Sequence, residues 1–229
     1  MKGTQAPLIT VEAGTWKRVL KWEGEAVLTL SLRWPKLPED RVGLRRMNRC
    51  YQRMAGLWQN RWEGALYQNA CEAAQAARKQ GRPCVLWEAV LDFTVTYQDE
   101  NLLSLYLDAY EYAGGAHGLT VRHADTWTLP AGIPRTLASF FPDRRWKKQV
   151  LAALHEEAHS RIAAGETLYY DDWPALLDAY FDPNRFYRTQ EGLAIYYPLY
   201  TIAPYAEGIA VFSLPLPAPV CDQKKQEKS

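Results

Sequence analysis

The chain has 229 residues and nearly balanced charges, with 27 basic and 26 acidic side chains and a formal net charge of +1. This balance gives no overall attraction to nucleic acid or to a membrane surface, and a hydrophobic content of 48% is typical of a globular protein. No stretch reaches the ~18 apolar residues of a membrane span, and residues 1–10 lack the apolar run of a signal peptide. Taken as complete, the sequence predicts a cytoplasmic protein with no membrane span and no nucleic-acid partner.

The charges are distributed unevenly along the chain. Residues 39–80 hold eight basic and four acidic side chains, whereas residues 155–191 hold eight acidic and three basic ones. Two regions of opposite charge can attract each other within one fold, or can steer a charged partner. The first interpretation is the commoner one. The four cysteines show no C-x-x-C spacing, so we expect reduced thiols and no cofactor.

The first third of the chain predicts a hairpin followed by a long helix. Residues 25–33 alternate apolar and polar side chains, as in a half-buried strand, and residues 16–22 are the expected hairpin partner, with Glu23-Gly24 at the turn. In residues 39–80, apolar side chains recur every three or four positions, which predicts one apolar helical stripe. Gly56 and Gly64 weaken this helix, and Gly81 with Pro83 ends it.

The middle of the chain predicts an antiparallel meander. Residues 85–97, 102–112 and 119–129 each alternate in character and are separated by the short polar or glycine-rich stretches QDEN and AGGAHG. The alternation in the first of these strands places Val85 and Val95 on its buried side.

The last third predicts a second helical block and more strands. A short helical turn at TLASFFPD precedes an amphipathic helix over 145–165, and strands follow at FYRT, GLAIYY and GIAVFSLPL. The helices stand in separate blocks between antiparallel strands, which predicts an α+β fold: antiparallel sheets packed against a long N-terminal helix and a second helix in the C-terminal half. We expect one compact unit with halves at 15–116 and 117–216, followed by a polar tail at 217–229.

The stretch HEEAH matches H-E-x-x-H, in which two histidines on one helical turn bind zinc and the glutamate acts as general base. The candidate residues are His155, Glu156 and His159. On a helical wheel, His155 lies at the margin of the apolar face and His159 about 115° from its centre, so the pair does not face the core. The alternative to a zinc hydrolase is therefore a solvated helix face that carries ordinary histidines.

The residues that a zinc site needs beyond this pair are missing. The longer zinc-protease pattern requires glycine at 162 and histidine at 165, where this chain has Ile162 and Gly165. A catalytic zinc also needs a third protein ligand, and no downstream signature provides one. The sequence therefore favours the solvated helix face, with no metal, over the hydrolase.

Two further stretches carry recognisable motifs. YAGGAHG, from Tyr112 to Gly118, is neither a dinucleotide fingerprint nor a P-loop, and its glycines suit a turn that His117 can tie by hydrogen bonds. The stretch from Phe186 to Leu216 reads F-Y-x-T-x-x-G-L and then P-x-Y-x-I-A-P-Y-A-x-G. Together these motifs resemble the RsiV-type domain of unknown function. The strand, WPKL and the helix with Met47-Asn48 are similar to the region that precedes the catalytic domain in PdaC-type peptidoglycan deacetylases.

The resemblance implies an α+β bacterial domain, usually extracytoplasmic, that is not known as an enzyme. In the lysozyme-sensing anti-sigma factor of the family, the domain binds lysozyme. The chain lacks that protein's sigma-binding segment and membrane span, and it lacks a deacetylase catalytic domain, so neither activity is carried over.

We therefore expect a non-catalytic binding or sensing module, whose partner is an unknown protein, such as a lysozyme, or a cell-wall glycan. The alternative is a zinc hydrolase built on HEEAH. Nine tryptophans and fourteen tyrosines also allow an aromatic surface that binds sugar. The predicted binding residues are Tyr112, His117, Pro198, Tyr200, Pro204 and Tyr205.

Overall fold

A computed structural model describes residues 8–216, so the predicted polar tail at 217–229 lies outside the described residues. Over these described residues the fold is α+β, as predicted, with nine strands in two sheets. Contacts group the chain into two units, unit 1 from Met1 to Pro134 and unit 2 from Arg135 to Ser229. Within the described range, no helix combines the length and apolar character that crossing a bilayer requires.

Unit 1 contains a six-stranded sheet whose strands stand in sequence order. Its strands are β1 (Glu12–Trp22), β2 (Glu25–Lys36), β3 (Trp87–Gln98), β4 (Leu102–Tyr112), β5 (Leu119–Thr128) and β6 (Ile133–Pro134). The predicted hairpin of β1 and β2 is present, with its turn at Glu23-Gly24. Strands β3, β4 and β5 form the predicted antiparallel meander.

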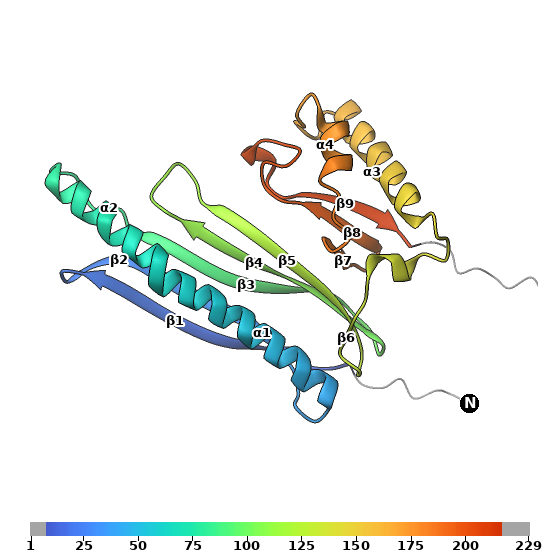
Figure 1. Ribbon diagram of the computed structural model, residues 1–229, viewed down its shortest axis with the longest axis horizontal. Coiled ribbons are helices and arrows are strands. Elements are labelled where there is room, and N and C mark those ends of the chain that lie inside the picture. Colours follow the sequence, from blue (N-terminus) through green and yellow to red (C-terminus); the bar gives the residue numbers. More distant parts are fainter. Residues whose placement is uncertain (1–7, 217–229) are drawn as a thin grey trace, which may run out of the picture. The chain divides into compact units, whose positions relative to one another are not determined.

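One pairing differs from the all-antiparallel prediction, because β2 and β3 run parallel. A parallel pair needs a crossover connection rather than a tight turn. The long helix between these strands provides that connection: it leaves the end of β2, crosses one face of the sheet and returns the chain to the start of β3 (Figure 1).

The crossover helix runs from Val42 to Lys79 and changes its winding once. It consists of α1 (Val42–Arg61), the π-helical turn η1 (Trp62–Leu66) and α2 (Tyr67–Lys79). The break expected at Gly64 is this π turn, whereas Gly56 lies inside regular α-helix. The predicted apolar stripe is confirmed by Leu44, Met47, Tyr51 and Trp62, all at most 2% exposed.

Two buried polar contacts fix α1 against the rest of unit 1. The Asn48 side chain accepts a hydrogen bond from the Leu37 backbone N–H at 2.8 Å and donates one to the Leu37 carbonyl oxygen at 2.9 Å. The Trp127 indole N–H donates to the Tyr51 hydroxyl oxygen at 2.6 Å. Because buried polar groups are costly unless paired, these contacts specify where the helix lies on the sheet.

Two expected core residues of β3 are exposed instead. Val85 is 48% exposed because the strand begins only at Trp87, two residues later than predicted. Val95 is 37% exposed, and the register between β3 and β4 shifts between Val95 and Tyr97. Such a bulge breaks the simple alternation of inward and outward side chains on which the prediction relied.

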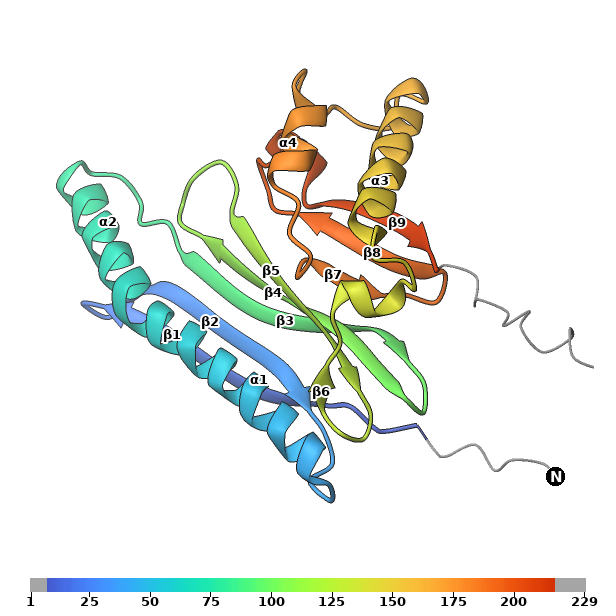
Figure 2. The same cartoon turned by 45° about the vertical axis from the view of Figure 1, so that its right-hand side comes forward.

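Unit 2 is a three-stranded antiparallel sheet with helices on one face (Figure 2). Its elements are the short 3-10 helix η2 (Leu137–Phe140), α3 (Trp146–Ala163), α4 (Trp173–Ala179), β7 (Phe186–Arg188), β8 (Gly192–Tyr197), the 3-10 turn η3 (Tyr205–Glu207) and β9 (Ala210–Pro215). The helical turn, the long helix and the three strands match the prediction, whereas α4 was not predicted. Ile162, in the last turn of α3, is 39% exposed, and Arg161 of the same turn donates to the Val211 carbonyl oxygen of β9.

Candidate functional site

The two histidines of HEEAH lie on α3 beside the unpredicted helix α4. The His155 Nε2 atom is 2.9 Å from the Asp178 Oδ1 atom, which belongs to α4. The His155 ring centroid is 5.5 Å from that of Trp173, and the His159 centroid is 4.9 Å from it, with an edge-on angle of 80°. Trp173 itself is only 7% exposed.

The imidazoles therefore lie against a buried indole on one side, while His159 remains exposed and His155 partly exposed, as expected of residues on a surface helix face. Helix α4, which carries Trp173, was not predicted. Glu156 is exposed, and no group of three His, Cys, Asp or Glu side chains suited to a metal ion forms anywhere in residues 8–216. The geometry of His155 and His159 is that of helix packing supported by one polar contact.

The next carboxylate of α3, Glu157, has a structural role at the edge of the sheet. β9 is an edge strand of the sheet β7–β8–β9. The Ser213 backbone N–H donates to the Glu157 carboxylate at 2.9 Å, and the Arg161 guanidinium donates to the Val211 carbonyl oxygen at 2.8 Å. Glu157 and Arg161 also form an ion pair with each other. The helix thus satisfies backbone groups that an edge strand otherwise leaves open to pairing with another chain.

The predicted binding residues of unit 2 share one segment, residues 198–209, which we term the aromatic-proline loop. It connects β8 to β9 and contains Pro198, Tyr200, Pro204 and Tyr205. Its middle is anchored in the core, because Ile202 is 1% exposed.

Hydrogen bonds add to this anchoring. The Glu207 carboxylate accepts one from the Thr167 hydroxyl and one from the Leu168 backbone N–H, both at 2.8 Å. The Tyr170 backbone N–H donates to the Ile202 carbonyl oxygen at 3.0 Å. Glu207 occupies an unspecified position of the motif, so no sequence signal distinguished it. The loop is therefore held at both its centre and its end.

Just before the loop, Tyr197 joins β8 to α4. It is 1% exposed, and its hydroxyl donates to the Leu177 carbonyl oxygen at 2.9 Å. Burial raises the pKa of this hydroxyl well above its ordinary value. Tyr197 therefore stays neutral and serves to position the start of the loop.

Tyr200 is the prominent side chain of the loop. Its backbone φ is +61°, a left-handed conformation that residues with a Cβ adopt rarely. The side chain is 47% exposed, and its ring centroid lies 5.8 Å from that of Tyr205, with the ring planes tilted by 34°. Unusual backbone conformations of this kind persist where the surrounding structure enforces them, and they cluster at functional sites.

The remaining two predicted binding residues lie in unit 1. Tyr112 ends β4, where it pairs with Glu88 of β3. His117 lies in the glycine-rich loop between β4 and β5, and its Nδ1 atom is 3.3 Å from the Gly118 carbonyl oxygen. Gly118 has no room for a side chain, since a Cβ would come within 2.3 Å of the Tyr110 ring. The geometry of this loop is that of a tight connection, as its glycines indicated.

Comparison with protein families assigns both halves of the chain. Residues 25–120 match the family described as deacetylase PdaC, and residues 138–216 match a protein family of unknown function, DUF3298. Each match covers less than half of the chain, so each describes the part of the chain that it covers. The predicted resemblance is thereby confirmed. The DUF3298 match includes the aromatic-proline loop and HEEAH, whereas the PdaC match includes the crossover helix and Tyr112.

Solved structures share this fold over almost the whole length. A DUF3298 family protein from Pseudomonas aeruginosa has a TM-score of 0.57 at 18% identity, with 93% of each chain covered. A member of the same family from Bacteroides fragilis has a TM-score of 0.61 at 19% identity, covering 93% of this chain and 92% of that one. No match was found among curated proteins. The likeness to the solved structures shows the fold alone.

Proposed function

We propose that this protein is a non-catalytic binding module and that the aromatic-proline loop of its DUF3298 domain contacts the ligand. The observation that carries the proposal is Tyr200, an exposed ring with a strained backbone on a loop that is otherwise firmly anchored. An anchored loop loses little entropy when it binds, so its contact energy goes into affinity.

The histidines of HEEAH and two glutamates of unit 2 have structural contacts of their own. His155 and His159 pack on Trp173, and Glu157 and Glu207 accept hydrogen bonds from backbone N–H groups. Each of these groups already has a function in folding. The proposal therefore assigns ligand contact to the tyrosines rather than a reaction to HEEAH.

A protein ligand fits the loop better than a glycan. A projecting tyrosine beside a second tyrosine resembles the aromatic anchors that dominate protein interfaces, because a large rigid ring fills a partner's pocket at low entropy cost. Pro198 stands two residues before Tyr200 and Pro204 directly before Tyr205, and both restrict the backbone further. Of the ligand classes that the family resemblance implies, we propose a lysozyme-type protein first and a cell-wall glycan second.

Binding measurements test the proposal directly. The full chain is titrated with a lysozyme and, separately, with soluble peptidoglycan fragments, and the dissociation constant is measured by calorimetry. We expect Tyr200→Ala to weaken lysozyme binding at least ~10-fold, since loss of an aromatic anchor costs about 2 kcal/mol or more. The Tyr205→Ala variant is expected to show a smaller loss, because its ring supports that of Tyr200.

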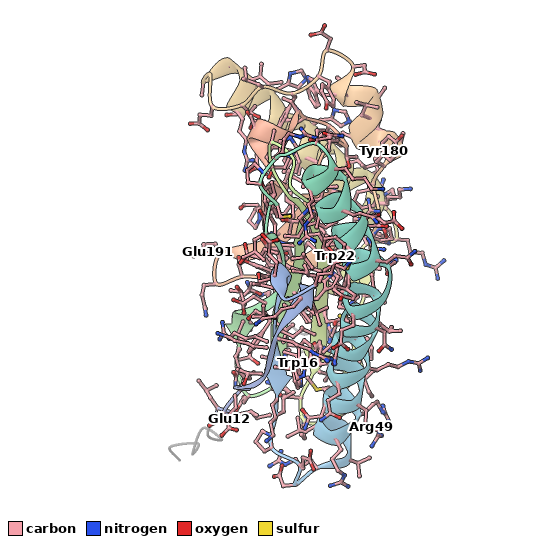
Figure 3. All side chains as sticks on the ribbon, turned by 90° about the vertical axis from the view of Figure 1, so that its left-hand side faces the viewer. Glu12, Trp16, Trp22, Arg49, Tyr180 and Glu191 are labelled. Atoms are coloured by element: carbon pink, nitrogen blue, oxygen red, sulfur yellow. The ribbon has the colours of Figure 1, made fainter. Side chains whose placement is uncertain are left out.

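The matched control is Tyr180→Ala, which removes a tyrosine that follows α4, is 53% exposed and lies outside residues 198–209 of the chain (Tyr180 is labelled in Figure 3). This variant should bind like the wild type. Equal losses in the Tyr180 and Tyr200 variants, or no binding of either probe by the wild type, would contradict the proposal. A lowered unfolding temperature in the Tyr200 variant would instead assign that ring to the fold.

A further inference from the structure

Helix α1 is strongly basic. Its 20 residues, from Val42 to Arg61, contain no aspartate or glutamate. They contain five arginines, at positions 45, 46, 49, 53 and 61. This helix is the source of the basic excess in residues 39–80. It belongs to unit 1, whereas the aromatic-proline loop belongs to unit 2.

Only part of this charge is neutralised by the fold. Arg61 forms a two-point ion pair with Glu111, and Arg45 donates to the Glu39 carbonyl oxygen. Arg46, Arg49 and Arg53 are exposed, and none of them has an ion pair or hydrogen bond to a side chain within residues 8–216. Their charges are therefore available to an external partner.

The three arginines share one face of the helix with exposed aliphatic side chains at both ends. Val42 is 63% exposed and Leu57 is 62% exposed. At 100° per residue, Val42, Arg46, Arg49, Arg53 and Leu57 fall within an arc of about 80° and a length of about 22 Å. We call these five residues the basic ridge. Figure 3 shows Arg49 beside α1, on the side of the helix away from β1.

The position of these charges does not favour the helix itself. The N-cap residue is Arg41, no side chain caps the helix start, and the first turn holds no acidic residue. Because the helix dipole is positive at its N-terminus, Arg41 and Arg45 are unfavourable there, whereas Arg46, Arg49 and Arg53 lie beyond the first turn, where the dipole has little effect. The dipole therefore does not account for the cluster.

We propose that the basic ridge docks on the surface of a bilayer that contains anionic phospholipid. The arginine fork suits phosphate oxygens, and basic side chains in a row are attracted to an anionic surface. Val42 and Leu57 add aliphatic contacts at the two ends of the row, where they can enter the headgroup region. A single straight helix face is convex, which suits a flat surface better than it suits a narrow ligand.

Nucleic acid fits the ridge less well. Binding of single strands relies on aromatic rings that stack on bases. The aromatic residues of α1 lie on its other side: Tyr51 is fully buried, and Trp58 packs against the core of unit 1. The ridge therefore offers charge and aliphatic surface without a stacking platform.

Vesicle co-sedimentation tests the proposal. The full chain is mixed with vesicles of phosphatidylcholine alone or of phosphatidylcholine with phosphatidylglycerol. We expect binding only to the anionic vesicles, and weakening as salt rises from ~0.1 M to ~1 M, since the Debye length falls from about 10 Å to about 3 Å. The triple variant Arg46→Gln, Arg49→Gln, Arg53→Gln should bind about a hundredfold more weakly, at about fivefold per arginine.

The matched control removes three positive charges from unit 2 instead, through Arg144→Gln, Lys147→Gln and Lys148→Gln. We expect this variant to bind within about twofold of the wild type. An equal loss of vesicle binding in both triple variants would show that only net charge matters, and it would overturn the proposal. The proposal would also be overturned if the wild type did not bind anionic vesicles, or if it bound neutral vesicles equally well. Tyr200→Ala should leave vesicle binding unchanged. The vesicle experiment can therefore contradict the docking of the basic ridge without bearing on ligand binding by the aromatic-proline loop, and the reverse also holds.

Discussion

At the scale of single residues, Glu111 shows how a charge is used to join the crossover helix to the sheet. It lies on β4, and its carboxylate accepts hydrogen bonds from Arg61 at 2.7 and 2.9 Å and from the Trp62 indole at 2.8 Å. Burial alone raises the pKa of this carboxyl, but the hydrogen bonds from Arg61 and Trp62 outweigh it, so the pKa lies below its ordinary value of 4.5. These donors sit where α1 passes into the π turn.

This lowered pKa predicts a defined pH dependence of stability. A carboxyl whose pKa is depressed in the folded state stabilises the fold above its unfolded pKa, and the stabilisation is lost as pH falls through the folded pKa. We expect Glu111→Gln to lower the free energy of unfolding by about 2 kcal/mol at neutral pH, since it weakens hydrogen bonds to a charged group. The difference from the wild type should shrink below pH 4.5, as the wild-type carboxyl becomes neutral.

Urea unfolding of both proteins over a pH series checks this prediction. Glu88→Gln is the control, because Glu88 is an exposed carboxylate on the neighbouring strand β3. A constant difference between wild type and Glu111→Gln at all pH values would show that the charge of Glu111 is irrelevant.

At the scale of elements, two glycines of α1 have opposite reasons to be there. Gly43 lies against the turn before β6, and a Cβ on it would come within 2.2 Å of the Pro130 carbonyl oxygen. Gly56, in the middle of the same helix, has nothing within 4 Å of such a Cβ. The first glycine therefore permits close packing of two backbones, whereas the second only adds freedom to the unfolded chain.

The same substitution should consequently have opposite effects at the two positions. We expect Gly43→Ala to destabilise unit 1 by about 3 kcal/mol, because two backbones must move apart. Gly56→Ala should stabilise it by about 0.5–1 kcal/mol, through helix propensity and reduced unfolded-state entropy. Thermal unfolding followed by circular dichroism measures both changes. Destabilisation of similar size at both positions would indicate that the contact at Gly43 is not the cause.

At the scale of the whole molecule, residues 8–216 form two hydrophobic cores, one in each unit. The first gathers side chains from the strands and crossover helix between Val27 and Leu129. The second gathers residues between Leu137 and Leu214. Each core consists of residues from one unit only, so the apolar burial that drives folding is complete within each unit.

Unit 1 is accordingly expected to fold by itself. Residues 8–134 expressed alone should unfold in a single cooperative transition, because a closed core and a six-stranded sheet remain intact. Calorimetry measures the transition, and the full chain serves as reference. A broad transition together with binding of a hydrophobic dye would show that unit 1 depends on residues beyond 134.

Much of the fold was predictable from local pattern, because the periodicity of apolar residues depends only on neighbours along the chain. Spacing and turn residues predict the β1–β2 hairpin and the three strands of unit 2. They also predict the apolar stripe of the crossover helix and its interruption at Gly64. The motif from Pro198 to Gly208 also indicated the family resemblance and the loop. The assignment of ligand contact to Tyr200 and its neighbours stays a prediction.

The tertiary structure alone determined the contacts between segments that are far apart in sequence. Local periodicity does not predict that β2 pairs in parallel with β3, or that Val95 is exposed at a bulge. It also does not predict the hydrogen bond between Thr167 and Glu207 or the packing of the HEEAH imidazoles on Trp173. Each depends on which surfaces meet once the chain has folded. The sequence by itself determined most of the elements and the family resemblance, because both depend on local pattern, and only the three-dimensional arrangement determined the partners of each side chain.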